Sequence, residues 1–474
     1  MNRLRSLLVV TCLLPMLNCC GGCSMGSPFG PPGPYRIRGT VSGLQNYYGV
    51  SGVVGHGVAL QMTGSAGTWP GGAQANGSGV DLMPGDSFAA GTTYNLTITM
   101  QPSAPAQTCV VKNGAGTIGN ADVTDVEIRC TTDTGRFLYV ADGGAAGVSG
   151  YAIDAASGAL TPIGGAPFAA GNGPAAIAVD LMTSFALVAN QGDGTVSGYV
   201  VDPATGALTA MGGSPFAAGS SPGSVAVEPF RGYVYVTDGA AGNVSAYEVT
   251  SGGSTASLAP LSGSPFMAGT APSALTVGLG GHGQEYLYVA NAGSNDISIA
   301  AITNGSGALT ATGGSPVATG AAPRALAIAP SGLFAYVADS GANTISGYAV
   351  DAATGALTPV PGSPFAAGTR PCAVAINLSS TLVLVANQGS DDVSAYAIDA
   401  ATGALTPVPG SPFAAGSAPC AVAVEPAGKF AYVANAGSDT VAAFSIDAAS
   451  GALTPVAGSP FATASLPSAI AVGD

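Results

Sequence analysis

Short hydrophobic segments separated by polar, turn-rich stretches recur from Arg136 to the C-terminus with a period of about 48 residues. One clear copy is FAYVADSGANTISGYAVDAATGALTPVPGSPFAAGTRPCAVAI, from Phe334 to Ile376. A fixed period of roughly 40 to 50 residues with several short strands per unit is typical of a β-propeller blade. The pattern therefore predicts an all-β chain dominated by a propeller.

Each repeat predicts four strands. The first is a short Ala/Val strand after a proline, and its small side chains suit the innermost place in a blade; the copies start at Pro174, Pro222, Pro272, Pro323, Pro371, Pro419 and Pro467. The second is aromatic or aliphatic and ends in Asp or Asn, at Asp142, Asn190, Asp238, Asn291, Asp339, Asn387 and Asn435. The third resembles VSGYAID, and the fourth is the ALTPVPGSPF segment, whose prolines fit an outer edge.

The phase of the repeats at the two ends predicts how the ring closes. The repeat region starts on a second strand, at Phe137, and ends on a first strand, from Pro467 to Val472. Neither partial unit completes a blade alone, so we expect the last strand to pair beside the first and to close a seventh blade. Such closure removes exposed strand edges.

Residues 35–132 lie outside the repeat. They contain alternating, strand-like runs such as YRIRGTVSG, TYNLTITMQ and DVEIRCT, separated by Gly, Asn and Pro turns. This pattern predicts a small antiparallel β-sandwich before a propeller domain at residues 133–474.

The N-terminus has the features of an export signal. In residues 1–23, Arg3 and Arg5 precede a short apolar segment, and LNCCGGC resembles a bacterial lipobox with Cys20 as the lipidated residue. Cys19 or Cys23, or cleavage as an ordinary secretory signal, are the alternatives. Residues 24–34 form a Gly/Pro tether. We expect a lipid-anchored monomer in the bacterial cell envelope, periplasmic or on the outer membrane, or secreted if not lipidated.

Composition narrows the classes of partner. Only 8% of residues are charged and the net charge is −14, with 25 acidic and 11 basic side chains. The chain has no Lys/Arg cluster, which excludes a nucleic-acid footprint and leaves a lipid anchor as the membrane contact. The partners left are an unknown protein or a small anionic ligand.

Four cysteines lie beyond the signal segment. Cys109 and Cys130 fall in strand-like runs joined by a turn-rich stretch, and in an exported chain they predict a disulfide. Closing a loop of about 20 residues would stabilise the fold by roughly 3 kcal/mol. Cys372 and Cys420 occupy equivalent places in adjacent repeats, where we expect buried free thiols; a disulfide between them is the alternative.

The strand-end tetrapeptides YVAD, YVTD and YVAN make the repeat region similar to YVTN-type propellers, within the wider group of lactonase-like seven-bladed propellers. That resemblance implies the fold over residues 136–474. Known enzymes of the group hydrolyse 6-phosphogluconolactone or cyclise muconate, so the resemblance also implies a lactonase as a candidate activity.

Most polar residues of the repeat have structural explanations. The Asp or Asn that ends each second strand should accept backbone N–H bonds in the following turn. In the DAA(S/T)GAL turns, such as that at Asp154, Asp opens the turn and Gly takes the positive-φ position. The phenylalanines of the SPF segments, such as Phe168, should wedge between blades, with a platform for sugars as the alternative.

Two residues that break the repeat are the candidate ligand-binding site. Arg324 and Arg370 begin innermost strands of adjacent blades, near one mouth of the central channel. A pair of guanidinium groups can hold a carboxylate or phosphate; pairing with Asp296, Asp391 or Asp392 is the alternative.

Other signs of catalysis are sparse. His56 and His282 are the two histidines, and neither is expected at that mouth. No metal-ligand spacing, nucleophile motif or phosphate loop occurs in the sequence, so we expect no cofactor and no metal. We therefore expect a non-catalytic scaffold for binding or protein interaction. The alternatives are a hydrolase of a sugar-acid lactone that uses Arg324 and Arg370, and a cell-surface or adhesion component.

Overall fold

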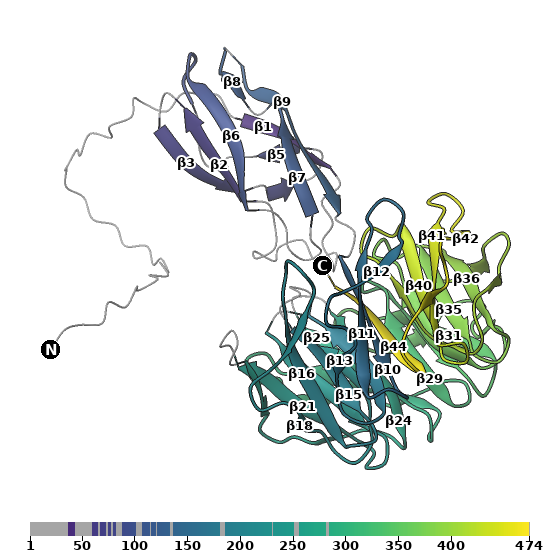
Figure 1. Cartoon of the computed structure of the whole chain (residues 1–474). Coiled ribbons are helices and arrows are strands. Elements are labelled where there is room, and N and C mark those ends of the chain that lie inside the picture. Colours follow the sequence, from purple (N-terminus) through teal and green to yellow (C-terminus); the bar gives the residue numbers. More distant parts are fainter. Residues whose placement is uncertain are drawn as a thin grey trace.

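The computed structural model describes residues 37–42, 59–64, 67–72, 74–76, 79–81, 88–100, 107–113, 115–119, 121–132, 136–180, 185–229, 231–250, 256–280 and 284–473. The described elements are all β-strands (Figure 1). Within these ranges, no helix is long and apolar enough to span a membrane.

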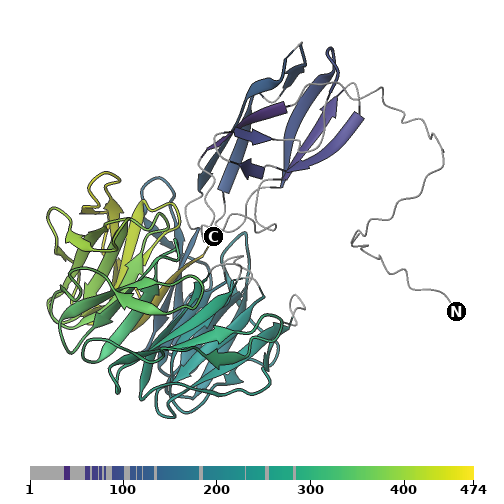
Figure 2. The same ribbon diagram turned by 180° about the vertical axis from the view of Figure 1, so that it is seen from behind.

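The repeat region forms seven five-stranded sheets arranged in a ring, as Figure 2 shows from behind. Each sheet has an inner strand, and these strands are β14 (Pro174–Val179), β19 (Pro222–Val227), β24 (Pro272–Leu279), β29 (Pro323–Ile328), β34 (Pro371–Ile376), β39 (Pro419–Val424) and β44 (Pro467–Gly473). The second strands are β10 (Phe137–Asp142), β15 (Phe185–Asn190), β20 (Tyr233–Asp238), β25 (Glu285–Asn291), β30 (Phe334–Asp339), β35 (Leu382–Asn387) and β40 (Phe430–Asn435). The third strands are β11 (Gly147–Ile153), β16 (Thr195–Val201), β21 (Asn243–Thr250), β26 (Asp296–Ile302), β31 (Thr344–Val350), β36 (Asp392–Ile398) and β41 (Thr440–Ile446).

The segment expected to be one outer strand is two short strands, both paired with the third strand of the blade. The first is β12 (Leu160–Pro162), β17 (Leu208–Ala210), β22 (Ser257–Pro260), β27 (Leu309–Ala311), β32 (Leu357–Pro359), β37 (Leu405–Pro407) and β42 (Leu453–Pro455). The second is β13 (Phe168–Ala169), β18 (Phe216–Ala217), β23 (Phe266–Met267), β28 (Val317–Ala318), β33 (Phe365–Ala366), β38 (Phe413–Ala414) and β43 (Phe461–Ala462). A turn and a dipeptide lie between them, Ala166-Pro167 in the first blade and Ser-Pro in the other six, and they interrupt the ladder because proline donates no backbone hydrogen bond.

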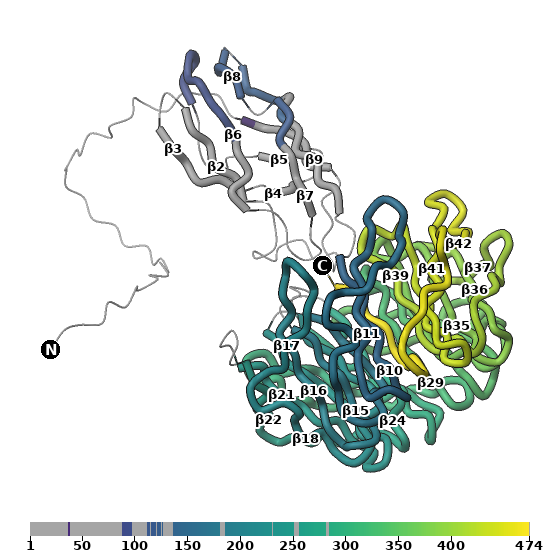
Figure 3. Tube along the Cα trace, viewed as in Figure 1, coloured from purple at the N-terminus to yellow at the C-terminus, as the bar shows by residue number. Residues whose placement is uncertain are grey.

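The predicted closure of the ring is confirmed. The last strand, β44, lies beside β10 (Figure 3) and pairs antiparallel with it. In this ladder Tyr139 lies opposite Ala471. The sheet order β12-β11-β10-β44 makes a full blade from the two ends of the repeat region.

The hydrophobic core lies between adjacent blades. One cluster joins Tyr139 and Val148 of one blade to Val188 and Tyr199 of the next, and the partly buried Phe168 packs against it, as the wedge interpretation predicts. The hydroxyl groups of five buried tyrosines each donate to a glycine carbonyl in the neighbouring blade, in the turn that follows its third strand. The pairs are Tyr139–Gly206, Tyr235–Gly307, Tyr288–Gly355, Tyr336–Gly403 and Tyr432–Gly158.

The described residues between 37 and 132 form two further sheets, of strand orders β4-β5-β1-β9-β7 and β3-β2-β6-β8. The pairing of β1 with β9 is parallel, so the first sheet is mixed and not antiparallel as expected. The strands are β1 (Ile37–Ser42), β2 (Ala59–Gly64), β3 (Gly67–Gly72), β4 (Gln74–Asn76), β5 (Gly79–Asp81), β6 (Thr93–Met100), β7 (Gln107–Lys112), β8 (Ala115–Thr117) and β9 (Val123–Thr132). In the β7–β9 ladder, the backbone of Cys109 lies directly opposite that of Cys130. The face-to-face sandwich, the domain boundaries and the disulfide stay predictions.

Candidate functional site

The inner strands enclose a cavity of about 740 Å³ at the end of the channel where they begin. Its wall is a ring made by the residue after the leading proline of each inner strand: Ala175, Gly223, Ser273, Arg324, Cys372, Cys420 and Ser468. Seven strands converge here, so the repeat holds small side chains at nearly every place in the ring. We call this cavity the channel mouth.

Hydrogen bonds across the ring hold the channel mouth together. The hydroxyl of Ser273 donates to the carbonyl of Pro323 in the next blade at 2.7 Å, and that of Ser468 donates to the carbonyl of Pro174 at 2.6 Å. The two cysteines make the equivalent contacts through sulfur: Cys372 Sγ lies 3.0 Å from the Pro419 oxygen, and Cys420 Sγ lies 2.8 Å from the Pro467 oxygen. Adjacent blades are thus joined by side chains of one ring position.

Arg324 is the cation of the channel mouth. Its side chain is exposed, and among the described residues it forms no ion pair. The acids considered as its partners bond elsewhere: Asp296 and Asp392 each accept from an asparagine side chain, and Asp391 accepts from the backbone of Ala418, all at 2.7 Å. The guanidinium group is therefore available to an anionic or carbonyl oxygen.

Arg370 lies at the rim and not in the described wall of the cavity. Its backbone is left-handed, with φ 54°, and its N–H donates to Asn343 Oδ1 at 2.8 Å. Alanine takes the same conformation at the equivalent positions of other blades, for example Ala322 with φ 48°. The side chain of Arg370 therefore has no necessary part in this backbone geometry.

The charges of the arginines affect the pKa values of the two thiols in the channel mouth. Burial raises the pKa of Cys372 to about 11, against the opposing charges of Arg324 and Arg370. Burial raises the pKa of Cys420 to about 12, with Cys372 adding to the rise and Arg324 opposing it. Both arginines thus lie close enough to Cys372 to influence it. Cys372 and Cys420 are free thiols, as expected.

Sequence reasoning missed two amides at the channel mouth. Gln191 and Gln388, the first residues after second strands, line the cavity, and Gln191 Nε2 donates to Ser221 Oγ at 3.2 Å. Gly143, Gly239 and Ala292 stand at the same position in other blades. Glutamine at this position departs from the repeat, as Arg324 does at its own, and this departure could have identified both amides from the sequence.

The Asp and Asn that end the second strands are structural. Asp238 accepts from the backbone N–H groups of Ala240 and Ala241 in the following turn, as expected, whereas other copies have different partners. Asp142 is buried, and its Oδ2 accepts from the backbone and the hydroxyl of Ser149 on the third strand. Asn190 donates to Ser197 on the third strand and accepts from Gly171. Asp142 and Asn190 thus link the end of the second strand to the third strand of the same blade. The Asp154 turn follows expectation, with Oδ1 accepting from Ser157 and Gly158 at φ 73°.

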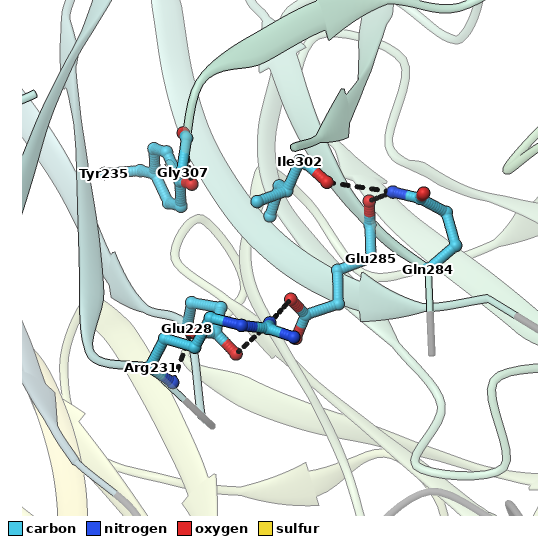
Figure 4. A network of polar contacts seen from close by, with 7 residues as sticks. All are labelled: Glu228, Arg231, Tyr235, Gln284, Glu285, Ile302 and Gly307. Carbon is cyan, nitrogen blue, oxygen red and sulfur yellow. Dashed lines mark hydrogen bonds and ion pairs between the residues drawn. The ribbon is translucent and has the colours of Figure 1, made fainter. Parts of the chain in front are cut away.

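Figure 4 shows a second polar cluster, absent from the sequence-based candidates. It lies at the opposite end of the strands from the channel mouth, because Glu228 directly follows β19 and Glu285 begins β25. Arg231 Nη1 contacts Glu285 Oε2 at 2.9 Å and Glu228 Oε1 at 3.9 Å. Glu228 and Glu285 are 0% and 1% exposed, and Glu285 Oε1 is buried without a hydrogen-bond partner among the described residues.

Burial and the neighbouring Glu228 raise the pKa of Glu285 to about 9. A proton on Glu285 removes the negative charge that burial and the neighbouring Glu228 disfavour. Because both groups are enclosed beneath Arg231, we assign this cluster to the packing of the fold and not to substrate binding.

Several predicted residues cannot be placed. Cys20, His56 and His282 lie outside the described residues, as do the export signal and the tether. Within the described part of the chain, no group of three or more His, Cys, Asp or Glu is arranged to hold a metal ion.

The family model "Lactonase, 7-bladed beta-propeller" matches residues 106–226, 213–367, 325–420 and 408–468. A search of curated proteins found no match.

Similar solved structures cover the propeller. One is a provisionally assigned 6-phosphogluconolactonase from Bacteroides fragilis, with TM-score 0.61 and 19% identity over 72% of this chain and 98% of that one. Another is a periplasmic gluconolactonase from Pseudomonas aeruginosa, with TM-score 0.59 and 21% identity over 71% of this chain and 99% of that one. At these identities the structures show a shared fold.

These findings correct the expectation of a non-catalytic scaffold. The matching family model is that of lactonases, and the similar structures carry lactonase names. Both favour the alternative stated above, a hydrolase of a sugar-acid lactone. The scaffold prediction gave too much weight to the uniform repeats, which report on how blades pack and carry little information about the few side chains in the channel mouth.

Proposed function

Since the chain belongs to the family of seven-bladed β-propeller lactonases, we propose that it hydrolyses the lactone of a sugar acid in the channel mouth. The proposal rests on the position of Arg324 in the wall of a cavity of about 740 Å³. Its guanidinium group is exposed and has no ion-pair partner among the described residues. Cavities of this size hold molecules of several hundred daltons.

The chemistry we assign to Arg324 is electrophilic. When water adds to a lactone carbonyl, it gives up a proton to solvent and negative charge develops on the carbonyl oxygen. A fixed donor aimed at that oxygen lowers the barrier. The ring C–O bond then breaks, and the leaving ring oxygen takes up a proton from solvent. The guanidinium group supplies such donors with a permanent positive charge. The amides of Gln191 and Gln388 add donors that orient the sugar hydroxyl groups in the same cavity.

Arg370 has a different part in this proposal. At the rim, it would contact a charged group of the substrate that lies away from the reacting carbonyl, such as the phosphate of a phosphorylated sugar lactone. It would therefore strengthen binding of phosphorylated lactones without changing the chemical step, so that its loss raises KM and leaves kcat unchanged.

The chain supplies matched variants for the test. Arg324→Ala reproduces Ala175 in the same ring, and Arg370→Ala reproduces Ala322, so both variants should fold. Hydrolysis of glucono-δ-lactone and of its 6-phosphate would be followed by acid release at mildly acidic pH, where spontaneous hydrolysis is slow.

We expect Arg324→Ala to lower kcat about 100-fold on both substrates. We expect Arg370→Ala to raise KM for the phosphorylated lactone alone. Lactone turnover that survives unchanged in Arg324→Ala would refute the assigned role of Arg324.

We propose further that the enzyme works in the cell envelope. The lipobox with Cys20 and the tether before the first domain support an anchored, exported protein, and a relative of the same fold is described as periplasmic. In that compartment a Cys109–Cys130 disulfide would form, as the opposed backbones of these residues allow. Labelled palmitate that attaches to wild type and not to Cys20→Ala would support the anchor.

A further inference from the structure

The thiols of Cys372 and Cys420 are a feature of the channel mouth that lactone hydrolysis does not use. They stand at the same position of neighbouring inner strands, β34 and β39, both line the cavity, and both are free. They are therefore accessible to a ligand that enters the mouth.

The hydrogen bond of Cys372 places its sulfur atom close to the backbone of Cys420. Cys372 Sγ lies 3.0 Å from the carbonyl oxygen of Pro419, the residue just before Cys420. Standard peptide dimensions put the Cα of Cys420 about 3 Å from that oxygen, so the Cys372 sulfur lies within about 6 Å of it. A change of χ1 rotamer can then bring the sulfur atoms to about 4.6 Å, the span of two metal–sulfur bonds of about 2.3 Å.

Sulfur is not required for joining the blades at this position. Ser273 and Ser468 make the equivalent bond to the next proline carbonyl at 2.7 and 2.6 Å. A thiol is also the weaker donor. What cysteine adds to the ring is a soft ligand atom, present twice on adjacent strands.

The charge in the channel mouth suits a pair of thiolates. Two thiolates and one monovalent cation carry a net charge of −1. The guanidinium group of Arg324, in the same ring, balances that charge. Thiolates prefer soft metal ions, and Cu(I) is the soft monovalent ion that cysteine selects.

We propose that Cys372 and Cys420 form a two-coordinate site for Cu(I) in the channel mouth. Binding releases the two thiol protons to solvent and forms two copper–sulfur bonds, with no change in the oxidation state of copper or sulfur. This site does not depend on the proposed lactonase activity.

The test compares the reduced, full-length chain with its Cys372→Ser/Cys420→Ser variant under anaerobic conditions. Serine is the natural residue at this position in two other blades, so the variant keeps the hydrogen bonds across the ring. Each protein would be titrated with Cu(I) against a colorimetric Cu(I) chelator. Copper held by the remaining cysteines is common to both proteins.

We expect wild type to hold one more Cu(I) than the double variant, and each single serine variant to bind that ion at least 10-fold more weakly. A Cys109→Ser/Cys130→Ser chain should retain it. X-ray absorption at the copper edge of that chain should show two sulfur neighbours lost with Cys372→Ser/Cys420→Ser. Equal copper in wild type and the double variant, or unchanged copper–sulfur scattering, would overturn the proposal.

Discussion

The buried pair of Glu228 and Glu285 makes the stability of the propeller depend on pH in a predictable direction. Glu285 is 1% exposed, and burial beside Glu228 raises its pKa to about 9. In the unfolded chain the same carboxyl group has a pKa of about 4.3. The substitution that isolates its effect is Glu285→Gln, which keeps the size of the side chain and removes the titration.

The sign follows from the number of bound protons. Between about pH 4.5 and pH 9 the folded chain keeps a proton on Glu285 that the unfolded chain has lost, so the free energy of unfolding falls as pH rises through this range. The contribution of Glu285 to the free energy of unfolding is fully present below the pKa of the unfolded chain and is lost once the pH reaches the pKa of the folded chain. The full shift corresponds to on the order of 6 kcal/mol.

Urea unfolding of wild type and Glu285→Gln at half-unit steps from pH 5 to pH 9, followed through the buried tyrosines, measures this contribution. Other buried acids, such as Asp339, titrate in both proteins and cancel in the difference. We expect the variant to gain stability relative to wild type steadily as pH rises. The exposed Glu248→Gln is the matched control and should follow wild type. A constant difference across the range would refute a shared proton at Glu285.

Three further predictions concern the ring. Tyr336→Phe leaves the carbonyl of Gly403 without its donor and should lower the free energy of unfolding in urea by about 1 to 2 kcal/mol. Leu384 occupies the equivalent position of the next blade without such a bond, so Leu384→Met should lower it by less. Deleting β44 exposes the edge of β10 and should lower the melting temperature and cause self-association on size exclusion; an unchanged monomer would contradict closure by this strand. Asp339→Asn copies the asparagines of other blades and should leave stability at pH 7 equal or higher, since burial raises the pKa of Asp339.

The fold could be predicted from the sequence because each repeat carries the same information several times. Prolines mark the starts of inner strands, Asp or Asn marks the ends of second strands, and the phase at Phe137 and Pro467 specifies the closing blade. The split outer segment was missed because a two-residue strand such as Phe168–Ala169 has too few positions to show an alternation.

The site was predicted only in part. Arg324 was found because it departs from its repeat, and the same reasoning applied to Gln191 and Gln388 would have found the amides. Glu285 gave no comparable signal: its burial and its contact with Arg231 arise from the meeting of two blades, which spacing along one repeat does not encode.

The central claim is that this propeller opens a lactone ring at Arg324 in the channel mouth. The measurement that tests it most directly is the initial rate of glucono-δ-lactone 6-phosphate hydrolysis by the full-length chain and by Arg324→Ala, at equal concentration and with spontaneous hydrolysis subtracted. We expect turnover by wild type and a rate about 100-fold lower in Arg324→Ala, with unchanged melting temperature. A wild-type rate no greater than the spontaneous one, or equal rates for the two proteins, would contradict it.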